Sequence, residues 1–374
     1  MTKYSMRHLL CIALFLLYCT CGCFAASVVQ QLPQKGQSAL QTYTVSDAKN
    51  GENWKPIRIG VYTKFVEDVM MYCKTKNQGL EEYEQLKTKI EEKPEYDYND
   101  EELAEQLGEE IAQLKLLCNG ADGMTEDKKN ILFRDILPKA IKLHTDRLEV
   151  NRFKVGENNQ IRSVTKSIQI GCELFRNPVE KNVQGSDYVD FMIYVGLWDS
   201  YKKVEICTQE KEKGRPTSAV IGFIPKEIKP TRQYIRLTAH EIAHGLGFEY
   251  NLMKDLGMIK DGYSYPQSTR VSTRGKVFSI VKSSKTVEMM ENHYKCEKGK
   301  LEGLYLENGN FGKPSHWERR IAKDELMSTY SNSMGVTGMY YTVLTLAAFE
   351  DMGFYRAKFD MAEPMISLDQ NHGV

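Results

Sequence analysis

Apolar residues along the chain follow two kinds of spacing. Short apolar runs at 190–195 and 219–224, bounded by Gly, Pro and charged residues, predict buried strands, and the alternating run 55–62 predicts a first strand. Apolar residues at helical spacing over 130–150 and 340–354 predict two amphipathic helices. The pattern therefore indicates a domain that mixes strands and helices.

Residues 80–117 differ from the rest because helical periodicity is combined with many charges and interrupted at Pro94. We expect a charged helical insert on the surface. Cys73 and Cys118 flank it and are predicted to pair across its base. A solvated insertion is the simpler interpretation, and a partner-binding arm is the alternative.

The N-terminus has the pattern of a secretory signal peptide over residues 1–25. Lys3 and Arg7 precede the apolar run 9–17, and small residues follow at the expected cleavage site before Ala26. That run is shorter than the ~20 apolar residues that span a bilayer, so cleavage is favoured over an uncleaved anchor. Residues 26–52 are polar and predict a short pro-segment or linker. The chain is therefore expected in the secretory pathway, extracellular or at the cell surface.

Composition narrows the functional classes. With 374 residues and 41% hydrophobic content, the chain is long enough for two compact units. Its 50 basic and 50 acidic residues balance, which gives no electrostatic case for binding nucleic acid. Outside the signal peptide five cysteines remain, and in a secreted protein most should pair. Cys172 and Cys207 bracket the run 190–195 and are predicted to pair, and the odd count leaves one cysteine without a partner.

The motif that carries chemistry is His240-Glu241-Ile-Ala-His244, followed by Gly247. On a helix, positions i and i+4 lie about 40° apart around the axis, so both imidazoles project from one face. Neutral imidazoles at this spacing suit Zn²⁺. Glu241 follows the first His, where a carboxylate can accept a proton from zinc-bound water. The motif predicts a zinc hydrolase that still needs a third protein ligand.

The position at which a short-spaced third His is expected, three residues after Gly247, holds Tyr250. The remaining candidates lie further along the chain: Glu288, Glu291, His293, His316 and His372. We favour His316, because it precedes Met327 by eleven residues (327 − 316), so that one segment supplies both a ligand and a Met-turn. His144, within the predicted helix 130–150, is expected to be a packed residue.

These segments resemble the leishmanolysin family of protozoan surface zinc metalloproteases, which are metzincins. The resemblance spans roughly residues 53–370, and its most specific motifs are His240–Phe248, Ser315–Glu318, Glu325–Met327 and Tyr340–Tyr355. It implies an α+β, metzincin-like fold in two subdomains. Residues 53–248 would hold a mixed sheet and the active-site helix. Residues 249–374 would be mainly helical or irregular and carry the third ligand and the Met-turn.

The resemblance also implies a zinc-dependent metalloendopeptidase that cleaves proteins or peptides and is linked to cell adhesion. One Zn²⁺ per chain would be held by His240, His244 and His316, with Glu241 as general base and Met327 as an apolar floor beneath the imidazoles. The strand 219–224 is assigned to pair with extended substrates. Membrane or cell-surface association is compatible with the family, and the oligomeric state is left open.

The chain departs from the family pattern in ways that suggest a second function. The sequence stops at Val374 without the expected Cys-rich C-terminal domain, and Val374 stands where the family partner of Cys296 is expected. The Met-turn reads Met327-Ser-Thr instead of Met-Ala-Pro. The alternative expectation is a catalytically weak, secreted adhesion or binding protein that retains the zinc-protease fold.

Overall fold

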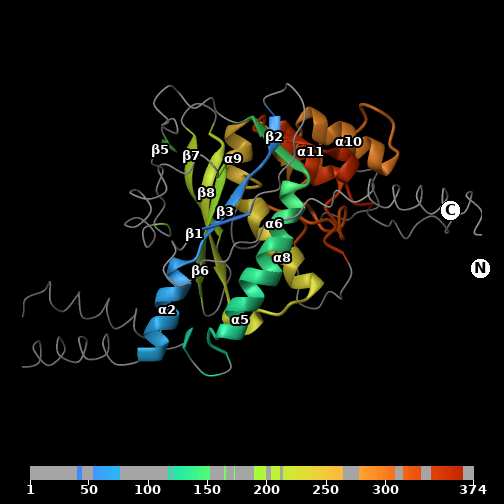
Figure 1. Ribbon diagram of the computed structural model, residues 1–374. Helices are drawn as coiled ribbons and strands as arrows, with labels where there is room; N and C mark the ends of the chain where they lie inside the picture. Colours follow the sequence, from blue (N-terminus) through green and yellow to red (C-terminus); the bar gives the residue numbers. More distant parts are fainter. Residues whose placement is uncertain are drawn as a thin grey trace, which may run out of the picture.

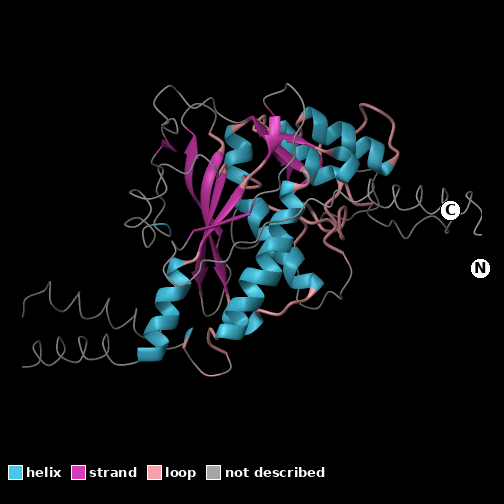
Figure 2. Ribbon diagram, in the orientation of Figure 1, coloured by secondary structure: helices cyan, strands magenta, loops and turns pink. Residues whose placement is uncertain are grey.

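A computed structural model shows the arrangement of the chain (Figures 1 and 2). It describes residues 40–43, 54–75, 117–118, 120, 122–151, 164–165, 172, 189–198, 204–210, 214–263, 278–307, 315–329 and 338–364. Helices and mixed sheets are both present, so the predicted α+β class is confirmed. The signal peptide, most of the pro-segment and the charged insert lie outside the described residues.

The main sheet is mixed. It contains six strands in the order β1 (Leu40–Tyr43), β3 (Ile59–Tyr62), β6 (Phe191–Leu197), β8 (Pro216–Phe223), β7 (Val204–Glu210) and β5 (Val164–Thr165). The neighbours β3, β6 and β8 are parallel, and the remaining pairs are antiparallel. All of β6 is buried, as expected for a parallel interior strand.

Both strands predicted from apolar runs are present as β6 and β8, but the role assigned to the second is wrong. β8 is hydrogen-bonded on one side to β6 and on the other to β7. Its backbone groups are therefore occupied by neighbouring strands, and an extended substrate cannot pair with it.

The strand predicted over 55–62 is in fact two strands in different sheets. β2 (Trp54–Pro56) pairs with β4 (Leu148–Asn151), which pairs with β12 (Tyr355–Ala357). Between β2 and β3, the backbone and guanidinium of Arg58 bind the carboxylate of Asp190. The β12–β4–β2 sheet joins strands from both predicted subdomains, and the division at residues 248/249 remains a prediction.

The predicted helix 130–150 is displaced toward the N-terminus. Helical structure runs through α5 (Glu126–Asn130), the π-helix η1 (Ile131–Ile136) and α6 (Leu137–Thr145), and residues 148–150 belong to β4 instead. The π-turns come just before Pro138, which has no N–H to donate to a regular helix. The alternation of buried and partly exposed residues from Leu148 onward fits a strand.

One face of the main sheet is covered by α6 and by α8 (Arg232–Gly245), which lie side by side (Figure 1). β8 leads to α8 through the short 3₁₀ helix η3 (Pro225–Glu227). The approach is close: a Cβ added at Gly245 would lie 3.0 Å from the Cβ of Ala219 in β8. The helix that carries the H-E-x-x-H motif is therefore packed directly on the parallel strands.

The second half of the chain contains short elements around a small antiparallel sheet, β11–β10–β9. Its elements are α9 (Tyr250–Asp255), β9 (Ile259–Tyr263), β10 (Phe278–Val281), α10 (Ser284–Tyr294), β11 (Leu304–Tyr305), α11 (Val343–Asp351) and η4 (Phe359–Met361). The helix predicted over 340–354 is thus present as α11 but shorter, because Thr342 caps its N-terminus by accepting a hydrogen bond from the Leu344 amide.

Both predicted cysteine pairs are confirmed as disulfides, Cys73–Cys118 and Cys172–Cys207. Cys296 is exposed and forms no disulfide. Within the described ranges, no helix combines the length and apolar character needed to cross a bilayer.

Candidate metal centre

The helix α8 positions the first two histidines. The side chain of Thr231 caps its N-terminus by accepting a hydrogen bond from the Tyr234 amide at 3.1 Å. His240 is buried and His244 half-buried, and they lie one turn apart, as the i, i+4 spacing predicts. A regular, capped helix packed on the sheet therefore fixes the relative placement of these two imidazoles.

The turn after α8 orients the second histidine. Gly247 has a φ of +119°, a backbone conformation that side chains with a Cβ rarely adopt. This turn brings the carbonyl of Phe248 back over the helix end, where it accepts a 2.7 Å hydrogen bond from Nδ1 of His244. Gly247 is therefore needed both to end the helix and to place this acceptor.

Three histidines converge at one point. The Nε2 atoms of His240, His244 and His316 lie 3.1 Å from one another in every pair. Nδ1 of His240 donates to the Leu326 carbonyl at 2.7 Å, as Nδ1 of His244 does to Phe248. A carbonyl only accepts, so in both rings the proton lies on Nδ1 and Nε2 presents a lone pair to the centre.

Burial keeps the two partly exposed rings of this centre neutral. Loss of solvent lowers the pKa of His244 to about 4. Burial, together with the nearby His244, lowers the pKa of His316 to about 3. Neutral imidazoles with convergent lone pairs are the donor set that Zn²⁺ takes, and carbonyls holding the other ring nitrogen are its usual supports. The residues present therefore fit a zinc ion.

The third histidine lies on irregular backbone. Residues 315–329 contain only isolated bridges, two of them at Trp317, to Leu306 and Ser328. Trp317 is fully buried, packs edge-on against Phe248 at 4.9 Å and donates from Nε1 to Thr345 Oγ1 at 3.0 Å. The side chain next to His316 thus anchors it.

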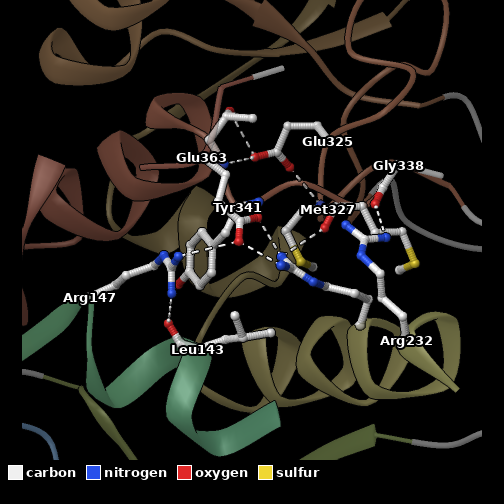
Figure 3. Close-up of polar contacts among 11 residues, drawn as sticks. Leu143, Arg147, Arg232, Glu325, Met327, Gly338, Tyr341 and Glu363 are labelled. Atoms are coloured by element: carbon white, nitrogen blue, oxygen red, sulfur yellow. Dashed lines mark hydrogen bonds and ion pairs between the residues drawn. The ribbon is translucent and has the colours of Figure 1, made fainter. Parts of the chain in front are cut away.

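Met327 lies in a turn and is fully buried. Its carbonyl accepts from the Trp317 amide at 2.9 Å, and its amide donates to the carboxylate of Glu325 at 2.7 Å (Figure 3). The predicted Met-turn and the segment carrying the third histidine are therefore joined directly by hydrogen bonds.

The chain after this turn is fastened to α8. Arg232 donates to the Gly338 carbonyl at 3.1 Å, and Arg236, one turn later, binds Glu363. The Glu363 carboxylate also accepts from the Tyr341 amide at 2.9 Å, and Arg147 lies over the Tyr341 ring (Figure 3). Two arginines of α8 therefore connect this helix to residues 338–341, directly at Gly338 and through Glu363 at Tyr341.

The other candidate third ligands lie elsewhere. Among the described residues, the group able to hold a metal ion is His240, His244 and His316. Glu288 pairs with Lys285 on the surface, and Glu291 accepts a hydrogen bond from the Gly299 amide. His293 is half-buried on α10, outside the cluster, and His372 lies outside the described residues.

His144 is packed, as expected. It is fully buried and lies between the Tyr341 hydroxyl at 3.2 Å and the Ala239 carbonyl at 2.9 Å. Burial lowers its pKa to about 3, so the ring is neutral. His144 thereby ties α6 to α8 at the residue before His240.

Tyr250 occupies the position where a short-spaced third histidine would be expected, and its contacts indicate a structural role. Its hydroxyl binds Asp261 at 2.6 Å, and its amide donates to Ser315 Oγ at 3.0 Å. This residue therefore supports the segment that carries His316.

Sequence reasoning missed the groups that support the ligands. The carbonyls of Leu326 and Phe248 were not singled out, and Glu325 was named only as part of the Glu325–Met327 motif, without a role of its own. Backbone carbonyls carry no sequence signal. Glu325 follows Lys323 and Asp324 in a charged stretch, so nothing in the sequence marked its carboxylate as buried.

Comparison with known proteins places the chain among peptidases. Residues 98–371 match the peptidase M8 family, described as leishmanolysin. Leishmanolysin of Leishmania major is 28% identical over 351 residues, covering 89% of this chain and 50% of that protein. Leishmanolysin of Leishmania donovani is 32% identical over 263 residues, covering 67% and 40%. A leishmanolysin-like peptidase of Drosophila melanogaster is 27% identical over 238 residues, covering 50% and 34%.

The chain spans half or less of the length of each of these relatives. The family match nevertheless covers well over half of the chain and includes all three clustered histidines. The chain therefore belongs to the leishmanolysin family of zinc metallopeptidases.

Proposed function

We propose that this chain is a zinc-dependent metalloendopeptidase that hydrolyses peptide bonds of proteins. One Zn²⁺ per chain would be held by the imidazoles of His240, His244 and His316. The observation that carries the proposal is the convergence of their three Nε2 atoms at 3.1 Å, with Nδ1 of the first two rings held by backbone carbonyls. Three protein ligands would leave one position for water or substrate, as in catalytic zinc sites.

The proposed mechanism assigns the proton transfers to Glu241. Bound zinc supplies a Lewis acid that polarises the scissile carbonyl and lowers the pKa of water beside it. Glu241 follows His240 on α8, is half-buried and is not one of the three clustered residues, which leaves its carboxylate available as the general base of the proposal. Its carboxylate accepts the proton of the attacking water and returns it to the leaving amine nitrogen. Met327 forms the apolar floor beneath the imidazoles.

The proposed substrates are proteins or peptides, encountered in an extracellular or cell-surface location. Disulfides persist in oxidising compartments, and the two pairs of this chain support passage through the secretory pathway. Membrane association and a link to cell adhesion remain predictions.

The test is a zinc count and a casein-cleavage assay on the full chain, beside Glu241→Ala. We expect one zinc per chain in both proteins and a loss of about 10²–10⁴-fold in cleavage rate for the variant. Glu288→Ala, which removes an exposed carboxylate outside the cluster, is the matched control and should keep full activity.

Two other results would contradict the proposal. One zinc per chain with no Glu241-dependent cleavage would favour the catalytically weak binding or adhesion protein. A folded chain without zinc would refute the ligand assignment itself.

A further inference from the structure

A buried carboxylate outside the proposed chemistry lies close to the metal centre. Glu325 is only 1% exposed and lies in the turn that contains Met327. Its Oε1 accepts from the Thr342 amide at 3.2 Å and the Thr342 hydroxyl at 3.0 Å. Its Oε2 accepts from the Met327 amide and the Thr345 hydroxyl, both at 2.7 Å. Two backbone donors and two hydroxyls thus surround one carboxylate.

The directions of these bonds identify the charge state that fits the site. The Thr342 hydroxyl accepts from the Leu344 amide and the Thr345 hydroxyl accepts from Trp317 Nε1, so both are free to donate to Glu325. All four partners are donors, and an ionised carboxylate satisfies all of them. Burial opposes ionisation and raises the pKa of Glu325 to about 7. The four donors therefore offset part, but not all, of the cost of burying the carboxylate charge.

The contacts of Glu325 lead to two of the three zinc ligands. The bond to the Met327 amide fixes the turn whose Leu326 carbonyl accepts from Nδ1 of His240 at 2.7 Å. A second route runs from Glu325 through the Thr345 hydroxyl to Trp317, the residue after His316. The ligand from α8 and the ligand from the irregular segment are thus oriented by the same carboxylate.

We propose that Glu325 is a positioning residue of the metal centre, which fixes His240 and His316 in the geometry that binds zinc. The proposal rests on the proposed function, because it takes the three-histidine cluster to be the zinc site. It assigns Glu325 no contact with zinc or substrate. Outer partners of metal ligands typically contribute about 10–100-fold to metal affinity.

The chain offers a matched control in Glu291. This residue is also buried, at 6% exposed, and lies in the same half of the chain. Its carboxylate accepts from the Gly299 amide at 2.7 Å, and that contact joins α10 to the loop that follows it, away from the histidines. A change of Glu to Gln is chemically the same at both positions.

The experiment measures zinc affinity by chelator competition in the full chain and in Glu325→Gln and Glu291→Gln. We expect the zinc Kd to rise about 10–100-fold in Glu325→Gln and to change less than about twofold in Glu291→Gln. The visible absorption bands of the Co²⁺-loaded protein report ligand geometry. They should shift in Glu325→Gln alone, which a purely structural role would not produce.

A second variant, Thr345→Val, removes the hydroxyl between Trp317 and Glu325 with little change in shape, and covers the case in which Glu325→Gln fails to fold. Its Kd should rise in the same direction by a smaller factor. Unchanged zinc affinity and unchanged Co²⁺ bands in the folded variants would overturn the positioning role, with the proposed function intact. If the wild-type chain binds no zinc, the proposed function fails and the positioning role fails with it. Zinc binding without cleavage would contradict the peptidase alone.

Discussion

The two regions that supply the proposed zinc ligands are built in different ways. α8 is a regular helix, capped by Thr231 and packed on β8, and the i, i+4 rule alone brings His240 and His244 together. Residues 315–329, which carry His316 and Met327, contain only isolated bridges. Their shape depends on side-chain contacts with residues further along the chain, above all those of Glu325 with Thr342 and Thr345. A metal centre can thus join one ligand pair placed by local geometry to a third placed by tertiary contacts.

The sharpest contrast between the regions comes from two helix caps. Thr231→Ala removes the cap of α8 and should cost about 1 kcal/mol of unfolding free energy, with zinc affinity unchanged. Thr342→Ala removes the cap of α11 and also takes a hydroxyl donor from the Glu325 carboxylate. Because Thr342→Ala loses both the cap and a hydrogen bond to a carboxylate, we expect it to cost about 2–4 kcal/mol of unfolding free energy and to weaken zinc binding. Denaturant unfolding and chelator competition measure both effects, and equal costs for the two variants would contradict the contrast.

The second prediction concerns pH and the metal-free chain. Folding raises the pKa of Glu325 from its ordinary 4.5 to about 7, so the native state binds the extra proton between these values. The stability that Glu325 contributes is therefore fully present below about pH 4.5 and is lost as the pH rises through about 7. The neighbouring Tyr294 and Tyr341 stay neutral throughout, because burial raises both their pKa values.

Glu325→Gln removes this titration. Between pH 5 and pH 8 the unfolding free energy of the variant should gain about 2–3 kcal/mol relative to the wild-type chain. Urea unfolding at a series of pH values, in the presence of chelator, measures the difference. The variant should thus gain relative stability as the pH rises while it binds zinc more weakly. A constant difference across this range would show that Glu325 is not the titrating group.

The smallest effect is expected in the turn that ends α8. Gly247→Ala places a Cβ at a φ of +119° and 3.0 Å from the Leu252 side chain, at a cost of about 1–2 kcal/mol. Gly257→Ala is the control, because φ there is also positive, at +72°, with no atom within 4 Å of the added Cβ. Both variants should lose stability, but only Gly247→Ala should weaken zinc binding, since its turn carries the Phe248 carbonyl. Thermal melts and chelator competition separate the two losses.

What the sequence could predict follows the same division. The apolar runs of β6 and β8, both disulfides and the i, i+4 histidine pair depend on local pattern or on residue type, and each was predicted. The proximity of His316 to the first two histidines came from its spacing to Met327 and from family resemblance.

The errors arose where tertiary contacts decide. Leu148 and Val150 fit a helical pattern as well as an alternating one, and only pairing with β2 and β12 makes their segment a strand. The break after Pro56 depends on contacts of Ile57 with Leu148 and of Arg58 with Asp190. The Glu325 network joins residues 17 and 20 positions apart on irregular backbone, a relation that no periodicity encodes.

X-ray absorption at the zinc edge, on the full chain loaded with one equivalent of zinc, tests the central claim most directly. The account predicts three imidazole nitrogens at about 2.0–2.1 Å from zinc and one oxygen neighbour, with one imidazole lost in His316→Ala. A sulfur neighbour at about 2.3 Å, or a spectrum that His316→Ala leaves unchanged, would contradict it.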